Sequence, residues 1–126
     1  MAMMRKQQMA AFSEDQARRF EERMVDHVRR CFPSEWRDLG EAQVREWIRT
    51  GVARAAEYGI DIEYDVARFV DLKYILAEDF DSNPEIPWAA AILKAPGLDA
   101  TTRMNRLYER SMAELKTLAD QEGKGG

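Results

Sequence analysis

The chain turns between two helices at Tyr58-Gly59-Ile60-Asp61-Ile62-Glu63-Tyr64-Asp65-Val66. Gly59 follows an apolar helical stripe and is placed to end a helix, because glycine adopts the left-handed backbone that helix C-termini favour. Asp61 is expected to cap the next helix, with Glu63 and Asp65 in the first turn, where negative charge suits the helix dipole. The stretch therefore predicts two helices joined by a tight turn.

Apolar residues on both sides of this turn follow helical spacing. Those before it predict a helix over about residues 41–58, and those after it reach Leu76 and cover more than one stripe, so the second helix should be buried on two sides. Gly51 falls on the apolar stripe of the first helix, where it costs about 1 kcal/mol of helix stability relative to alanine. We expect a close helix–helix approach as the compensation.

The segments before and after this pair also predict helices. Ser13 and Gln16 form a capping-box pattern in front of a helix over about residues 14–32, and Pro33 ends it. Residues 35–40 are typical of a short turn or single helical turn that ends at a glycine. Pro87 is placed as the first residue of a short helix over 87–93.

A last helix is expected to begin at an Asp99 cap and to end near Glu122. The fold class predicted is all-α, a single compact domain of four to five helices arranged as a helical bundle. We expect residues 13–122 to form this domain. Residues 1–12 should be a flexible or partner-binding segment, and residues 123–126 a disordered tail.

Composition and charge exclude several classes of function. The chain has 126 residues, a net charge of -4 and a pI near 5.1, so a global attraction to nucleic acid or to an anionic membrane is not expected. Its one cysteine, Cys31, cannot form an internal disulfide and sits at core spacing, which predicts a buried thiol. No apolar run follows the basic residues near Met1, so we expect no signal peptide and a cytoplasmic location.

Two patterns resemble metal sites, and neither predicts a metal or another cofactor. His27 and Cys31 lie at i,i+4, but the sequence has no further histidine or cysteine to complete a zinc site. Asp79, Asp81 and Asn83 occupy positions one, three and five of a calcium loop. Proline at the sixth position and alanine at the twelfth replace the required glycine and glutamate. The alternative is that Asp81 or Asn83 shapes the turn by bonding nearby backbone amides.

Catalysis and DNA reading are also disfavoured, and we expect no enzyme. A Cys31–His27 dyad would need an orienting third group and an oxyanion hole, which the sequence does not signal. A helix-turn-helix reader would present Glu63 and Asp65 to the phosphates, and these charges oppose binding.

Protein binding is the remaining class. Tryptophan is enriched at interface hot spots, although in small helical domains it is more often part of the core. Trp47 falls on a core stripe, whereas Trp36 and Trp88 lie near loop ends and are candidates for partner contacts. The apolar, methionine-rich segment over residues 1–12 could also adapt to a partner.

Several motifs resemble one family: Phe32-Pro33, Gly51-Val52-Ala53-Arg54-Ala55 with Tyr58-Gly59-Ile60, Asp65-Val66-Ala67-Arg68-Phe69, Asp79-Phe80-Asp81, and Pro87-Trp88-Ala89. The chain is similar, from about Phe20 to Leu115, to small helical proteins encoded beside effectors and effector chaperones in bacterial type VI secretion clusters. The resemblance implies a co-chaperone or adaptor that binds an effector chaperone and assists effector loading. It implies no catalytic residues.

If the resemblance holds, the turn at Asp61 and Glu63 and the acidic loop with Asp79 and Asp81 are candidate partner contacts, alongside Trp36 and Trp88. The alternative is an immunity protein that inhibits a cognate toxin by direct binding, because such inhibitors are often small and acidic. The amphipathic helices could also bury their stripes across a homodimer.

Overall fold

The computed structural model describes residues 12–125, with side chains for residues 12–122. It confirms the all-α prediction, since these residues form helices and no strand. The predicted turn at 35–40 is a helix in its own right, which brings the described helices to six rather than four or five. They are α2 (Glu14–Cys31), α3 (Pro33–Leu39), α4 (Glu41–Glu57), α5 (Glu63–Ile75), α6 (Pro87–Leu93) and α7 (Ala100–Gly125).

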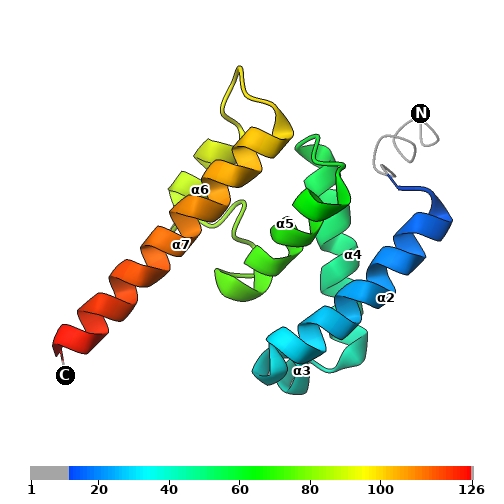
Figure 1. Ribbon diagram of the computed structural model, residues 1–126, viewed down its shortest axis with the longest axis horizontal. Coiled ribbons are helices and arrows are strands. Elements are labelled where there is room, and N and C mark those ends of the chain that lie inside the picture. The colour runs from blue at the N-terminus through cyan, green and yellow to red at the C-terminus, as the bar shows by residue number, and fades with distance from the viewer. Residues whose placement is uncertain (1–11, 126) are drawn as a thin grey trace.

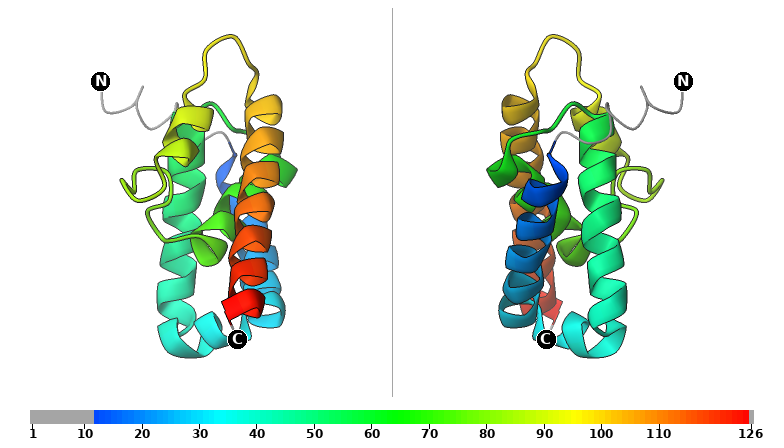
Figure 2. Two further views of the ribbon diagram at one scale, coloured as in Figure 1. Left: turned by 90° about the vertical axis from the view of Figure 1, so that its left-hand side faces the viewer. Right: turned by 90° about the vertical axis from the view of Figure 1, so that its right-hand side faces the viewer.

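Helix α5 lies in the middle of the fold (Figure 1). It packs against α4 on one side and α7 on another, which confirms that its apolar surface is buried on more than one face. Helix α2 packs on α4, α3 joins their lower ends, and α6 covers the upper part of α7 (Figures 1 and 2). The C-terminal part of α7 runs away from the other helices, and Leu118 on it is 55% exposed.

Most predicted helix starts are confirmed. Ser13 Oγ accepts a hydrogen bond from the Gln16 backbone N–H at 3.1 Å, and Asp99 Oδ1 accepts from Thr102 N–H at 2.7 Å. Pro87 opens α6. The prediction that the Gln16 side chain completes the capping box is wrong, because its amide donates to Glu63 Oε2 on α5 at 2.9 Å.

The Asp61 cap is also wrong. Helix α5 begins at Glu63, so the cap position falls on Ile62, and no side chain caps this helix. Asp61 lies one residue farther out and is exposed. The preceding turn was predicted correctly: Gly59 has a φ of 76°, and Ile60 N–H donates back to Ala55 O at 2.9 Å.

Both predicted ends of the domain need correction. The backbone of 123–125 continues α7, so the predicted tail at 123–126 begins too early. Phe12, assigned to the flexible segment, is buried, and its ring lies 5.3 Å from that of Phe20. The prediction for residues 1–11 falls outside the described residues.

The close helix approach expected at Gly51 is confirmed. A Cβ at this position would lie 2.9 Å from Val70 Cγ2 and 3.3 Å from Lys73 Cδ on α5. Real Cβ atoms do not come this close to a stiff β-branched side chain, so α4 and α5 can pack this tightly only because residue 51 is glycine.

Gly51→Ala should therefore destabilise the fold by about 1–2 kcal/mol, although alanine is the better helix former by about 1 kcal/mol. Urea unfolding measures the change. The matched test is the Val70→Ala background, where the obstructing methyl groups are absent and the alanine at 51 should cost less or become favourable. Additive effects of the two substitutions would contradict a direct clash.

A cluster of charges joins α2 to α4. The side chain of Glu21 is mostly buried and accepts from Arg45 Nη1 at 2.7 Å and from Arg49 Nε at 2.7 Å. The hydrogen bond from Arg49, reinforced by that from Arg45, lowers the pKa of the Glu21 carboxyl below its ordinary value near 4.5. These ion pairs join the outer faces of α2 and α4.

Because of this pKa shift, the contribution of the cluster to the free energy of unfolding depends on pH. Because the folded-state pKa of Glu21 is depressed, its contribution is present above the unfolded value near 4.5 and is lost as the pH falls through the folded value. Glu21→Gln should lower the free energy of unfolding at neutral pH and flatten its decline below about pH 4.5. Glu22→Gln, which removes an exposed carboxylate beside the same Arg45, is the control for denaturation measured across pH. Equal pH profiles for the two variants would contradict this role.

Candidate protein-interaction site

Two large apolar side chains are exposed to solvent where the turn after α4 leads into α5. Ile62 is 56% exposed and Tyr64 is 70% exposed, and the acidic Asp61 and Glu63 alternate with them. We call these four residues the turn surface. Apolar side chains exposed together on a rigid element and surrounded by polar groups are typical of protein-interaction sites.

The backbone of the turn is fixed by a buried side chain and by a hydrogen bond from α7. Ile60 is fully buried, and the Arg103 guanidinium on α7 donates to Tyr58 O at 2.8 Å. Gly59, with its positive φ, allows the chain to reverse over this anchor. The turn is therefore fixed to two helices, and Ile62 is presented by a constrained backbone.

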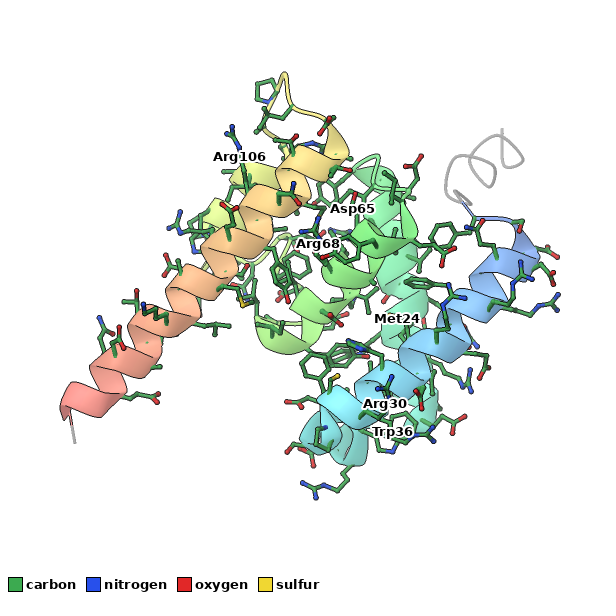
Figure 3. The ribbon with its side chains drawn as sticks, in the orientation of Figure 1. Met24, Arg30, Trp36, Asp65, Arg68 and Arg106 are labelled. Carbon is green, nitrogen blue, oxygen red and sulfur yellow. The ribbon has the colours of Figure 1, made fainter. Side chains whose placement is uncertain are left out.

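Two of the four side chains of the turn surface, those of Glu63 and Tyr64, are also held by neighbouring residues. Glu63 Oε1 pairs with Arg23 of α2, and its Oε2 accepts from Gln16. The guanidinium of Arg68 lies over the Tyr64 ring, 4.8 Å from its centroid. Arg68 is itself fixed, because its Nη2 donates to Asp65 Oδ1 at 2.7 Å and to Asn105 Oδ1 at 2.8 Å. Figure 3 shows Asp65 and Arg68 between α5 and α7. A partner that binds Tyr64 would thus meet a ring already held in place.

Beside Tyr64 the surface is hollowed. A depression of about 220 Å³ lies between α2 and the start of α5, lined by Phe20, Met24, Ala67 and the Arg23–Glu63 pair. Its floor is apolar and its rim is charged. This arrangement suits an apolar side chain of a partner, with polar contacts around it.

The other predicted contact, the acidic loop, is built differently from the expectation. Asp81 is only 5% exposed, and its Oδ2 accepts from Arg54 Nε at 2.9 Å and from Tyr58 Oη at 3.0 Å. Its carboxylate therefore holds the loop onto α4 rather than facing a partner. Asp79 and Glu85 are exposed. Asn83 shapes the turn as anticipated, since its Oδ1 accepts from Glu85 N–H at 2.8 Å.

Tyr58 connects the loop to the turn surface. Its hydroxyl donates to Asp81, and its carbonyl accepts from Arg103. Burial, followed by the neighbouring Asp81 charge, raises the pKa of the Tyr58 hydroxyl. The hydroxyl therefore stays protonated at neutral pH and remains a donor to Asp81.

The predicted tryptophans do not join this site. Trp36 lies on α3 at the opposite end of α4 from the turn, half-buried, with the Arg29 guanidinium 5.6 Å from its ring centroid (Figure 3). Trp88 is half-buried on α6 under Arg110, at 4.9 Å. The prediction that Trp47 belongs to the buried core is wrong, because its ring is only half-buried and packs on Tyr74 at the edge of the fold.

The cysteine prediction also needs correction, since Cys31 is exposed on the last turn of α2. Its Sγ lies 3.6 Å from His27 Nδ1, and His27 Nε2 lies 2.9 Å from Asp71 Oδ1 on α5. The structure thus supplies the third group that a Cys–His dyad lacked in the sequence. Burial raises the pKa of Asp71, and the neighbouring His27 opposes that rise. The His27–Asp71 contact ties α2 to α5.

The sequence alone names Asp61 and Glu63 as candidate contacts and does not point to the exposed Ile62 and Tyr64. The exposure of Tyr64 could have been predicted from the sequence. On a helix it lies on the same face as Arg68, four residues later, and not on the core face of Val66 and Phe69. The exposure of Ile62 could not, because it lies four residues before Val66 and spacing alone would place it in the core. It is exposed because α5 starts only at Glu63.

Comparison with family models, with curated proteins and with solved structures finds no match to the chain. Within the described residues, no helix has the length and apolar content to cross a membrane, and no three His, Cys, Asp or Glu side chains gather in a way that could hold a metal ion.

Asp81 and Asp79 should respond very differently to substitution. Asp81→Asn removes a buried charge from Arg54 and Tyr58 and should cost about 2–4 kcal/mol of unfolding free energy. Asp79→Asn, on the exposed side of the same loop, should stay within about 0.5 kcal/mol. Chemical denaturation monitored by circular dichroism compares them. An Asp81→Asn protein as stable as the Asp79→Asn control would show that the loop does not depend on this anchor.

Proposed function

We propose that this chain is a non-enzymatic, protein-binding adaptor of the co-chaperone kind, which binds an effector chaperone and assists effector loading for type VI secretion. The observation that carries the binding role is the exposure of two large apolar side chains, Ile62 and Tyr64, two residues apart where α5 begins. The resemblance of the sequence motifs to small accessory proteins of type VI secretion clusters supplies the class of partner.

The physical features of the turn surface support a docking role. Two exposed apolar side chains provide contact area, and the Arg68 guanidinium and the Arg23–Glu63 pair order their surroundings before binding. Such preorganisation reduces the entropy lost on association. The exposed Asp61 supplies a negative charge beside the two apolar side chains, and the Arg23–Glu63 pair supplies a polar rim, which favours a partner surface with a basic group near an apolar centre.

The proposal separates the roles of the two predicted contact regions. The turn surface is the docking surface, and Asp79 is an exposed member of the acidic loop that can add a charged contact. Asp81 is expected to affect partner binding only by stabilising the fold. An Asp81 variant that loses partner binding would therefore report lost structure, whereas an Asp79 variant would report on the contact itself.

The decisive experiment begins with affinity purification of the tagged protein from cells that encode it, followed by identification of what is recovered. The expected partner is an effector chaperone, alone or with its effector. Recovery of a toxin with no chaperone, together with protection of toxin-expressing cells, would replace the adaptor proposal by the immunity alternative. A folded protein that recovers neither would contradict both.

The docking surface is then tested with the purified partner. The double variant Ile62→Ser/Tyr64→Ser should weaken binding by at least about tenfold, since truncating central apolar contacts commonly costs 1–2 kcal/mol or more. Its unfolding free energy should change by less than about 1 kcal/mol, because both side chains are exposed. Leu118→Ser removes an equally exposed apolar side chain from α7 and is the control in titration calorimetry. If Leu118→Ser weakens binding and the double variant does not, the docking surface is on α7.

A further inference from the structure

Three titratable side chains that the docking surface does not use lie in line at the end of α2. The exposed Cys31 has its Sγ 3.6 Å from His27 Nδ1, one turn earlier on α2, and His27 Nε2 lies 2.9 Å from Asp71 Oδ1 on α5. We call these three residues the thiol cluster. A base beside a thiol, oriented in turn by a third group, is the arrangement that activates cysteine nucleophiles in proteins.

Asp71 determines which nitrogen of His27 is the base. An ionised carboxylate only accepts hydrogen bonds, so a neutral imidazole at this position donates its Nε2 proton to Asp71. The lone pair is then on Nδ1, the nitrogen next to Cys31 Sγ. The Asp71 side chain is only 16% exposed, and the Phe32 ring packs edge-on against the His27 ring. The proton acceptor is therefore held toward the thiol before a reagent arrives.

The surroundings of the thiol indicate which reaction it suits. Acyl transfer forms a tetrahedral oxyanion, which needs hydrogen-bond donors held ready to receive it. Thiol–disulfide exchange needs only a deprotonated thiol, access to its sulfur and a thiolate that can leave. Cys31 is the last residue of α2 and is exposed, so a small disulfide can reach its Sγ. A small disulfide is therefore the class of reagent that fits the thiol cluster.

We propose that Cys31 is a nucleophilic thiol that exchanges with small disulfides, with His27 as its base and Asp71 as a positioning residue. The Cys31 proton moves to His27 Nδ1 as Sγ attacks one sulfur of the disulfide R–S–S–R. A bond forms between Cys31 Sγ and that sulfur, the original S–S bond breaks, and the other half leaves as the thiolate R–S⁻. The imidazolium then gives the proton to this thiolate or to water. The disulfide is itself the oxidant, and the product is a mixed disulfide on α2.

Neighbouring charges on α2 offer a competing explanation of a reactive thiol. Arg30 precedes Cys31 in the chain and is labelled near the lower end of α2 in Figure 3. A nearby guanidinium can favour a thiolate by charge alone. The Asp26 carboxylate already pairs with Arg30 at 2.9 Å and with Arg29 at 3.0 Å, which offsets much of this charge. Arg30 nevertheless has to be separated from His27 by experiment.

The groups on the other side of the thiol cluster add no charge of their own at neutral pH. Burial, followed by the Asp71 charge, raises the pKa of the hydroxyls of Tyr74 on α5 and Tyr108 on α7. Both tyrosines therefore stay protonated and neutral. Asp71 is thus the charged group that α5 brings to His27.

Exchange kinetics in the full chain test the proposal. The probe is 2-hydroxyethyl disulfide, which is small and uncharged, and intact-mass spectrometry follows its adduct on the one cysteine of the chain. At about pH 6, where an ordinary thiol is almost entirely protonated, the wild-type protein should react at least about threefold faster than His27→Gln. The glutamine can still donate to Asp71 but is no base. Asp71→Asn should also slow the exchange and shift the pH profile of the rate toward that of His27→Gln.

Two controls separate the base from other causes. Arg30→Gln removes the neighbouring positive charge, and its exchange rate should stay within about twofold of the wild-type rate. In concentrated urea the thiol cluster is dispersed, so the wild-type and His27→Gln proteins should react equally fast, and the wild-type protein more slowly than when folded. Circular dichroism reports whether each variant is folded.

Several outcomes would overturn the proposal. Equal rates for folded wild-type and His27→Gln proteins at every pH would mean that His27 is not the base. An Arg30→Gln protein slowed as much as His27→Gln would mean that charge explains the reactivity. A folded wild-type protein that reacts no faster at about pH 6 than its urea-unfolded form would overturn the proposal without any variant. An Asp71→Asn protein with the wild-type rate and pH profile would overturn the role given to Asp71.

Discussion

Helix α5 can lie against α4 only because residue 51 has no side chain where Val70 meets it. The rest of the fold depends on this approach. With α5 close to α4, its other face is free to receive α7, and α7 in turn carries α6. Helix α2 then closes over α4 and reaches α5 through His27 and Asp71. A larger residue at 51 would move α5 and, with it, every helix that packs on α5.

Buried charges complete what the apolar packing begins. Asp65 accepts from Thr101 at 2.7 Å and joins α5 to α7, while Asp81 joins the loop to α4. Lys73, 5% exposed, donates to Thr50 at 3.1 Å between α5 and α4, and burial lowers its pKa. Each of these groups has a partner on another element. Charges buried in this way are costly when a partner is lost, so they favour one arrangement of the helices over others.

The proposed docking surface arises from the same construction. The helices use their apolar stripes for the core, and the remaining apolar side chains lie on the surface. At the turn this leaves Ile62 and Tyr64, with the Arg68 guanidinium over the Tyr64 ring and with Glu63, which lies between them in the sequence, in an ion pair with Arg23. Between α2 and α4 it leaves a groove whose apolar lining includes Phe12, Ala17 and Val52.

The sequence by itself determined the helices, since hydrophobic spacing, proline, glycine and the Ser13 and Asp99 caps act within a few residues. It also determined the close approach at Gly51, because only contact with another helix offsets a glycine on a core stripe. Only the tertiary structure decided which polar groups face inward. Asp81 and Asp79 are alike in sequence, but Arg54 and Tyr58, more than twenty residues away, bury one of them. Cys31 and Trp47 follow the spacing of core stripes and yet lie at the edge of the fold. Spacing determines only which face of a helix a side chain lies on. Whether that face is buried depends on whether another helix packs against it.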